Sequence, residues 1–536
     1  SLGINVPNGF VVTSSSYDCF LKYNKISDFI NKNIKTLNVN DYDNLKSISA
    51  EIRNKIKNGY FPEYIKNEIS DKYKQLSNSY NTYEVDVAVR SSGTSEDMPD
   101  ASFAGQQDTY LNIKGIDNLL KKIKDCFASL YNERAISYRK SMNYDNKIIK
   151  LSVCIQKMVR SDLKSSGVAF SIDTYSGCKN IISINASYGL GETVVSGQVN
   201  PDEYIVFKPN IKCNNPIIDK KLGSKEKKLV YDSDNNTKLV NTINSERNNF
   251  CLSDNDIKKL SKWVIKIEDY YSKKYKKWCP VDVEWGIDGI NNELYILQSR
   301  PETVFSQEEE IIFKEYKMID GQKKNIIVSG VSIGDKISSG KTVLIENLDD
   351  KESISKFNNG DILVTNITDP DWEPIMKISG GIITNKGGRT CHAAIVAREL
   401  GVPAVVGTNE CTKKIKNNQI ITLSCAEGET GYIYEGKIDF EVTNTNIKDI
   451  PKINTKIMLN VASPNECFKF AKIPNSGVGL AREEFIINNF IKIHPLALLN
   501  YDKLKDNELK KNINKLIIGF KTPIDYYINK LSYGIG

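Results

Sequence analysis

Apolar and polar residues alternate in several short runs of the first half of the chain, and this period of two is typical of β-strands. Residues 85–90 and 151–159 show the alternation clearly. Residues 281–286 and 294–301 alternate in the same way on either side of Asp288-Gly289, so we predict a β-hairpin there. Residues 116–142 have the spacing of a helix instead.

A second compact region is predicted over residues 326–436. It holds a predicted strand at 361–364, a helix that starts near His392, and two strands at 420–423 and 431–434. Gly401 and Pro403 should stop that helix, because a glycine after the last turn and a following proline are typical of helix C-termini. Polar segments flank this region at 304–325 and 437–455 and read as linkers, and a predicted strand at 457–461 opens the last part.

Size and composition fit a soluble globular protein of several domains. At 536 residues the chain is too long for one core, so about two to four domains are expected. Its 40% hydrophobic and 26% charged residues are ordinary values. The net charge of +7 suits phosphate-bearing ligands but does not indicate a nucleic-acid partner.

Cysteine usage favours a reducing, cytoplasmic location. None of the eleven cysteines forms a C-x-x-C pair, so neither a zinc site nor a disulfide framework is indicated. No apolar stretch reaches the ~20 residues that would span a bilayer, and no secretory leader is visible. The chain starts at Ser1 without a methionine, and we expect that both ends are cut from a longer protein.

His392 is the most informative residue, because the chain has only two histidines. Gly387 and Gly388 should bring its loop close to another part of the molecule, and Thr390 supplies a hydroxyl. An imidazole at a helix N-terminus faces free backbone N–H groups and the positive end of the helix dipole, which suits a group that carries phosphate. A buried or capping histidine remains the alternative. Cys391 could be a thiol nucleophile, although a space-filling role is favoured.

A histidine that carries phosphate needs a phosphate donor, and the first half of the chain offers suitable groups. Arg90 can grip phosphate through two hydrogen bonds. Glu284 and Gln298 stand on the two arms of the predicted hairpin, where their oxygens could coordinate Mg²⁺, and Arg300 should project to the same face. A surface ion pair of Arg90, or a hydrogen-bonded pair of Glu284 and Gln298, remains open. The chain has no Walker A loop.

The run from Gly387 to Pro403 is similar to the phosphohistidine signature of the phosphoenolpyruvate-utilising enzymes, the family of phosphoenolpyruvate synthase and pyruvate phosphate dikinase. Further similar motifs lie at residues 88–92, 100–106, 156–159, 189–192, 297–301 and 477–487. The resemblance implies a multidomain α/β and α+β protein. Its expected parts are an ATP-grasp-type nucleotide-binding domain at 1–303, a linker at 304–325, a swivelling β/β/α phosphohistidine domain at 326–436, a linker at 437–455 and the N-terminal fragment of a TIM barrel that binds phosphoenolpyruvate or pyruvate at 456–536. A phosphate-binding lysine motif of the family would precede Ser1 and is missing.

The resemblance also implies a role for individual residues. His392 would be the phosphate carrier and Thr390 its hydroxyl partner, while Arg482 would bind substrate phosphate. Nucleotide binding would fall to a larger set: Arg90 and Arg300 on the phosphates, Glu284 and Gln298 on Mg²⁺, Gly105 and Thr109 beneath the phosphates, and Gln156, Met158 and Val159 along the adenine. His494 would have a structural role only.

The implied reaction converts ATP, pyruvate and water into AMP, phosphoenolpyruvate and phosphate, with Mg²⁺, through phosphorylated His392. The sequence Arg389-Thr390-Cys391-His392 favours a synthase over a dikinase. A dikinase, an antibiotic-phosphorylating relative and a nucleotide-binding fragment without complete activity remain alternatives. We expect the chain alone to lack full activity, and a homodimer through the barrel is a further expectation.

Overall fold

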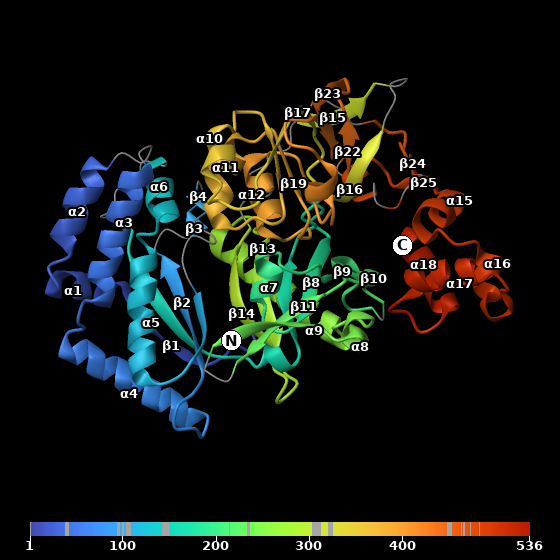
Figure 1. Ribbon diagram of the computed structural model, residues 1–536. Helices are drawn as coiled ribbons and strands as arrows, with labels where there is room; N and C mark the ends of the chain where they lie inside the picture. Colours follow the sequence, from blue (N-terminus) through green and yellow to red (C-terminus); the bar gives the residue numbers. More distant parts are fainter. Residues whose placement is uncertain are drawn as a thin grey trace.

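The computed structural model describes most of the chain, and four parts follow one another across the molecule (Figure 1). N-terminal helices and a small sheet lie at one side, a larger sheet lies in the middle, a β-barrel lies above it, and C-terminal helices lie at the other side. The described residues are 2–37, 42–93, 97–98, 101–102, 109–141, 149–213, 215–232, 236–302, 312–319, 325–446, 453–461, 464, 467–471, 473–481 and 483–535.

The first part is a four-stranded sheet packed against helices. The predicted strands at 85–90 and 151–159 are confirmed as β2 and β6, which pair antiparallel. The predicted helix at 116–142 is interrupted after Ser129, because residues 130–132 form a turn. The sheet order is β1 (Gly9–Val12), β6 (Leu151–Lys157), β2 (Val87–Gly93) and β5 (Thr109–Ile113). The helices are α1 (Ser14–Tyr23), α2 (Ser27–Thr36), α3 (Tyr42–Lys57), α4 (Glu63–Ser79), α5 (Ile116–Ser129) and α6 (Glu133–Ser141).

The second part is a six-stranded antiparallel sheet with helix α9 against it. The predicted hairpin is confirmed, and its register sets Glu284 opposite Gln298. Helix α9 begins with a capping box between Ser253 and Asp256, which satisfies free N–H groups of its first turn. The strand order is β10 (Ile217–Lys221), β9 (Asp202–Phe207), β8 (Ile181–Tyr188), β7 (Ser165–Phe170), β13 (Val281–Ile287) and β14 (Leu294–Pro301). Beside it lie α7 (Glu192–Val195), α8 (Asn244–Arg247), α9 (Asp254–Tyr275) and the ribbon of β11 (Lys227–Tyr231) and β12 (Thr237–Asn241).

The third part is a closed barrel that carries the helix of His392. Helix α12 (His392–Leu400) ends at Gly401, whose φ of 64° is left-handed, so the predicted helix stop is confirmed. Buried apolar residues form one cluster that includes α12 and a second cluster without it, and alternate residues of β18, β19 and β20 contribute to each. Around the barrel run β16 (Ile326–Ile333), β20 (Ala404–Val406), β19 (Gly381–Thr384), β18 (Ile362–Thr365), β17 (Ile337–Leu344), β21 (Ile420–Ser424) and β22 (Thr430–Glu435). The other helices are α10 (Lys351–Ser355), α11 (Glu373–Ile378) and α13 (Cys411–Lys414).

The two segments predicted as linkers each contain a strand. Strand β15 (Ile312–Met318) pairs antiparallel with β23 (Phe440–Asn446), so the connections on both sides of the barrel form one ribbon. Tyr316 packs against Phe440 with ring centroids 6.1 Å apart. A two-stranded ribbon buries few of its side chains, so its strands can be mostly polar. For that reason the polar sequence of these two segments does not predict a strand.

The C-terminal part begins with a parallel pair of strands. Strand β24 (Leu459–Val461), inside the predicted strand 457–461, pairs with β25 (Val478–Ala481). Helix α18 contacts the middle sheet, where Lys530 forms an ion pair with Asp219 at 2.8 Å. The helices are α14 (Cys467–Phe470), α15 (Glu483–Phe485), α16 (Pro495–Leu499), α17 (Asn507–Ile517) and α18 (Pro523–Ile535).

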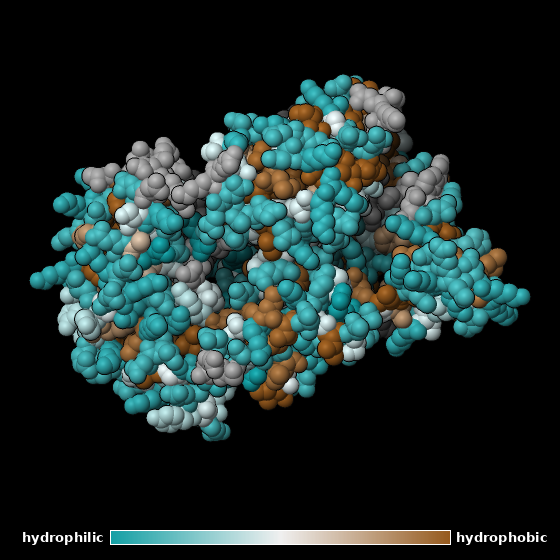
Figure 2. Space-filling model, viewed as in Figure 1, coloured by the Kyte–Doolittle hydropathy of each residue, from teal (hydrophilic) through white to brown (hydrophobic). Residues whose placement is uncertain are grey.

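Hydrophilic residues cover most of the face shown in Figure 2, and hydrophobic residues gather over the barrel. Every helix in the described ranges is too short or too polar to cross a membrane. All eleven cysteines are free thiols.

Candidate active site

A cavity of about 590 Å³ lies where the two sheets and the barrel meet. Its walls carry Arg90 from β2, Glu284 from β13 and His392 from α12. Residues far apart in the sequence therefore face one cavity. Nine residues singled out from the sequence line it: Arg90, Thr109, Gln156, Met158, Val159, Glu284, Gln298, Arg300 and His392.

Arg90 joins the two sheets across this cavity. One of its guanidinium nitrogens, Nη1, donates to Glu284 Oε2 and to Gln298 Oε1, both at 3.0 Å. The Nε–H of Arg90 is buried and has no acceptor among the described residues. A buried donor without an acceptor costs free energy, so this N–H is suited to an anionic ligand in the cavity.

Arg300 extends the positive side of the cavity. Its Nε donates to the carboxylate of Asp282 at 2.7 Å, across the β13–β14 pair. The prediction that Arg300 shares a face with Gln298 is confirmed, because both line the cavity. Arg90 and Arg300 therefore offer two guanidinium groups to one ligand.

Glu284 and Gln298 fit a divalent cation of the hard, oxygen-preferring kind. Their side-chain oxygens converge on one point, where Nη1 of Arg90 now supplies the positive charge. A carboxylate and an amide oxygen are the donor types that Mg²⁺ prefers. Among the described residues no cluster of three or more His, Cys, Asp or Glu side chains has the geometry of a complete metal site. These two groups would therefore supply part of a coordination shell.

The opposite wall of the cavity is apolar. Met158 and Val159 are 5% and 6% exposed, and Met158 packs in one buried cluster with Ala88 and Leu190. Gln156 precedes them on β6 and is 8% exposed. An apolar wall beside a few polar groups is typical of pockets for planar organic ligands.

His392 stands at the first position of α12, with Cys391 as the N-cap residue. Thr368 Oγ1 lies 3.2 Å from His392 Nδ1. Burial, and secondly the positive charge of Arg134, lower the pKa of His392 to about 4. The imidazole is therefore neutral near pH 7 and has a lone pair for bonding.

The environment of Cys391 favours the space-filling interpretation. Its side chain is 4% exposed, and burial raises the pKa of its thiol. A protonated, enclosed thiol is a poor nucleophile, so His392 is the better candidate for covalent chemistry.

Two residues of this site, Thr368 and Arg134, were not predicted from the sequence. Thr368 supplies the hydroxyl that lies within hydrogen-bond distance of the ring. Thr390 is 3% exposed, and its role as the hydroxyl partner of His392 remains a prediction. Arg134 also lines the cavity and pairs with Asp371 of the barrel part at 3.3 Å. The turn after β18, rich in polar residues and Pro370, was the available signal for Thr368.

Two predicted binding residues, Gly105 and Arg482, lie outside the described residues. Thr109 is described, and it lines the cavity from β5. The roles of all three remain predictions.

Comparisons with known proteins agree with this arrangement. Residues 1–320 match the family described as "Pyruvate phosphate dikinase, AMP/ATP-binding domain", and residues 357–428 match "PEP-utilising enzyme, mobile domain". The chain is 48% identical to a phosphoenolpyruvate synthase of Aquifex aeolicus, with 100% of this chain and 68% of that protein covered. It is 47% identical to the Helicobacter pylori enzyme of that name and 42% identical to that of Escherichia coli, with 100% of this chain and 66% of each relative covered. The chain thus spans about two thirds of the length of these relatives.

Proposed function

The chain belongs to the family of phosphoenolpyruvate synthases and pyruvate phosphate dikinases, and on that premise we propose that its cavity transfers a phosphoryl group from ATP to His392. This transfer would be the first half of phosphoenolpyruvate synthesis from ATP, pyruvate and water. The proposal rests chiefly on one observation. His392 lines the same cavity as Arg90, Glu284, Gln298 and Arg300, so a phosphate held by these groups would lie within reach of the ring.

The proposed step uses the free nitrogen of the imidazole. Thr368 occupies the Nδ1 side of the ring, which leaves Nε2 to attack the β-phosphorus of ATP. A bond forms between Nε2 and that phosphorus, and the bond to the oxygen that bridges to the α-phosphorus breaks. The bridging oxygen keeps the electron pair and leaves as part of AMP. Water then attacks the γ-phosphorus, phosphate leaves, and a single phosphoryl group remains on Nε2.

The remaining residues would hold the charge and orientation of the nucleotide. Arg90 and Arg300 would donate to phosphate oxygens, and Gln156, Met158 and Val159 would line the adenine on the apolar wall. Positioning and charge stabilisation supply most of the catalysis in phosphoryl transfer. Glu284 and Gln298 would hold Mg²⁺, which neutralises phosphate charge when it is bound.

The second half of the reaction would take place elsewhere. We propose that residues 326–436 form a swivelling domain and that residues 456–536 open a TIM barrel for pyruvate and phosphoenolpyruvate, with Arg482 on the substrate phosphate. One imidazole can serve two separate sites only if it moves between them. The β15–β23 ribbon joins both ends of the barrel part to the rest. This two-stranded ribbon would therefore act as the hinge of such a movement.

Labelling with β-³²P ATP tests the proposed transfer. We expect the intact chain to gain acid-labile label on His392 and His392→Ala to gain none. His494→Ala is the matched control, because that ring is exposed, lies outside the cavity and accepts a hydrogen bond from the N–H of Leu496. Label that persists in His392→Ala would sink the assignment.

Two alternatives are separated by further measurements. A dikinase would consume inorganic phosphate in forming phosphohistidine, whereas a synthase would release it, so a phosphate assay during single turnover decides between them. A fragment that only binds nucleotide would bind ATP in a calorimeter and never acquire label.

A further inference from the structure

The loop that carries His392 touches the nucleotide-binding sheet at points outside the cavity. Tyr175, in the connection between β7 and β8, donates its hydroxyl hydrogen to the carbonyl of Gly428 in the barrel part at 2.7 Å. The guanidinium carbon of Arg389 lies 5.4 Å from the centre of the Tyr175 ring. Arg389 lies three residues before His392, so the ring of Tyr175 contacts the loop of His392 directly, while its hydroxyl contacts the connection between β21 and β22.

Arg389 is fixed by contacts within the barrel part. It forms an ion pair with Glu429 at 2.9 Å and is 8% exposed. Its carbonyl accepts a hydrogen bond from Arg398 of α12 at 2.6 Å. The face of the Tyr175 ring therefore meets a guanidinium that is already fixed within the barrel part, which favours one geometry of contact.

Gly197, two residues after the end of α7, gives a second contact of a different kind. A Cβ built on Gly197 would lie 2.4 Å from Cβ of Cys391, the N-cap residue of the histidine helix. No side chain fits in that gap, so the backbone of the nucleotide part approaches the start of α12 closely. The φ of Gly197 is +70°, a conformation that glycine adopts easily.

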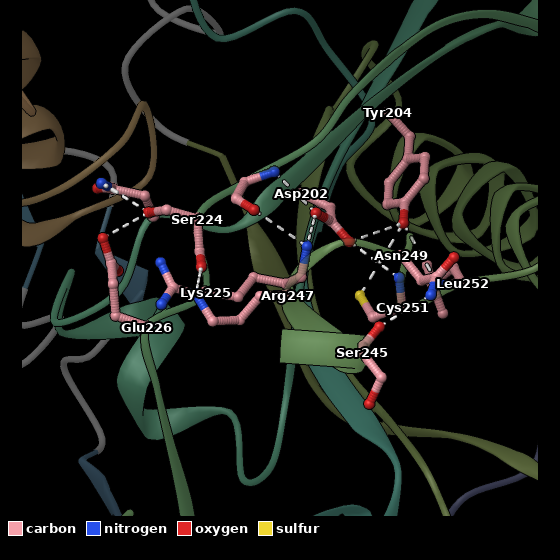
Figure 3. A network of polar contacts seen from close by, with 12 residues as sticks. Asp202, Tyr204, Ser224, Lys225, Glu226, Ser245, Arg247, Asn249, Cys251 and Leu252 are labelled. Carbon is pink, nitrogen blue, oxygen red and sulfur yellow. Dashed lines mark hydrogen bonds and ion pairs between the residues drawn. The ribbon is translucent and has the colours of Figure 1, made fainter. Parts of the chain in front are cut away.

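The surface that receives the loop is firmly built. Pro201 faces Gly388, where an added Cβ would meet Pro201 Cδ at 3.5 Å. The next residue, Asp202, accepts hydrogen bonds from Lys225 Nζ and from the backbone N–H groups of Gly223 and Cys251 (Figure 3). The side chains of Asp202 and Lys225 are both 0% exposed. Buried, fully bonded groups of this kind move little.

We propose that Tyr175 and Gly197 are positioning residues, which seat the loop of His392 so that the ring reaches the nucleotide. This inference rests on the phosphoryl transfer proposed above. Neither residue lines the cavity, so each acts through the loop rather than on ATP. Tyr175 sets where the loop lies along the sheet, and Gly197 sets how closely the start of α12 approaches.

The required precision explains why two such contacts would matter. An in-line attack needs the nucleophile within about 3–3.5 Å of phosphorus, and a misplacement of about 1 Å can cost roughly 100-fold in rate. A substitution of Tyr175 or Gly197 should therefore slow the chemical step. ATP binding should be unaffected, because Arg90, Glu284 and Gln298 belong to the two sheets.

Gly197→Ala tests the close approach. We expect its rate of His392 labelling from β-³²P ATP to fall roughly 100-fold, with the dissociation constant for ATP unchanged by calorimetry. Gly334→Ala is the matched control, since Gly334 is also left-handed, with a φ of +83°, but an added Cβ there meets nothing within 4 Å. Gly334→Ala should label at the normal rate, which separates the clash at Cys391 from the strain of alanine in that conformation.

Tyr175 is tested with a graded pair. Tyr175→Ala removes the ring and the hydroxyl and should slow labelling roughly tenfold, whereas Tyr175→Phe keeps the ring beneath Arg389 and should retain most of the rate. Tyr83→Ala, at a tyrosine that is 94% exposed, should behave like the unchanged chain. If Gly197→Ala also loses ATP binding, the Tyr175 pair decides alone.

The outcomes separate this inference from the proposed function. If the unchanged chain, Gly197→Ala and Tyr175→Ala are all labelled equally fast, the positioning role of Gly197 and Tyr175 is refuted, whereas the proposed phosphoryl transfer is supported. Equal loss of rate and of ATP affinity in both variants would also refute it, because that pattern indicates a structural role. If the unchanged chain never labels, the proposed transfer itself fails.

Discussion

At the scale of single residues, the contact between Thr368 and His392 decides which nitrogen can react. Thr368 is 2% exposed, so its hydroxyl has few alternatives to the ring nitrogen 3.2 Å away. A neutral imidazole carries one N–H and one lone pair. We expect Nδ1 to keep the proton and to donate it to Thr368, so that the lone pair of Nε2 faces the nucleotide.

Thr368→Val tests this tautomer because valine keeps the shape and removes the hydroxyl. Loss of one hydrogen bond of about 1 kcal/mol would let the ring turn and adopt the other tautomer, so we expect His392 labelling to slow roughly five- to tenfold. Thr368→Ser restores a hydroxyl and should recover most of the rate. Normal labelling in the valine variant would show that the hydroxyl does not select the nitrogen.

Sequence reasoning found the residues whose position follows from local alternation. Glu284, Gln298 and Arg300 lie on the two arms of one hairpin, so the period of two was enough to predict a shared face. Thr368 lies 24 residues before His392, and Arg134 belongs to another part of the chain. Their approach depends on how the barrel closes and where it rests, and neither is encoded in a local pattern.

At the scale of elements, the buried ion pair of Lys225 and Asp202 joins strand β9 to the segment before β11. Such a pair was not predictable from sequence, because its two charges look like ordinary surface residues. Removing one partner from a buried pair leaves an uncompensated charge, which usually costs about 3–5 kcal/mol. Strand β9 and its neighbours should therefore depend strongly on Lys225.

We expect Lys225→Met to lower the free energy of unfolding of the nucleotide-binding part by about 3–5 kcal/mol, measured by urea denaturation followed through tryptophan fluorescence. Lys220→Met is the matched control. Lys220 pairs with Asp254, whose side chain is 58% exposed, and an ion pair at the surface contributes about 0–1 kcal/mol. An equal loss of unfolding free energy in Lys225→Met and Lys220→Met would show that the buried ion pair contributes no more to stability than the exposed one.

The β15–β23 ribbon shows the limit of pattern reasoning for elements. Hairpins and helices with one buried face were predicted correctly, as β13, β14 and α12 show. The ribbon was missed because its strands lie far apart in the sequence and are mostly polar. Their pairing follows from the barrel, which brings its own two ends together.

At the scale of the whole molecule, the chemistry of His392 depends on where the barrel rests. Burial lowers the pKa of the ring to about 4, and Arg134 from the opposite part contributes second. Glu192 of the nucleotide part and Asp369 and Glu373 of the barrel part also line the cavity. If the barrel moved away, the ring would enter water and its pKa would return to about 6.5.

The arrangement in which the barrel part buries His392 against the nucleotide part should therefore become less stable in acid. Its histidine binds a proton only near pH 4, whereas an exposed histidine binds one near pH 6.5. The stabilisation is complete above pH 6.5 and is lost progressively as the pH falls toward 4. We expect an NMR titration of labelled histidine to give a pKa clearly below 6.5 for His392, and Gly197→Ala to shift it upward.

The chain offers a simple spectrum for that titration, because His494 supplies the only other histidine signal. His494→Gln identifies which signal belongs to His392. A value near 6.5 for His392 in the unchanged chain would mean that the ring spends most of its time in water.

The barrel that carries His392 is closed, with β16 paired to both β20 and β22. A ring of strands has no first or last member, so its amide and carbonyl groups are satisfied from within. If this part leaves its neighbour and returns during turnover, as proposed above, it would offer no open strand edge to which another molecule could adhere. Resistance to aggregation during catalysis would then be a property of the architecture rather than of any single side chain.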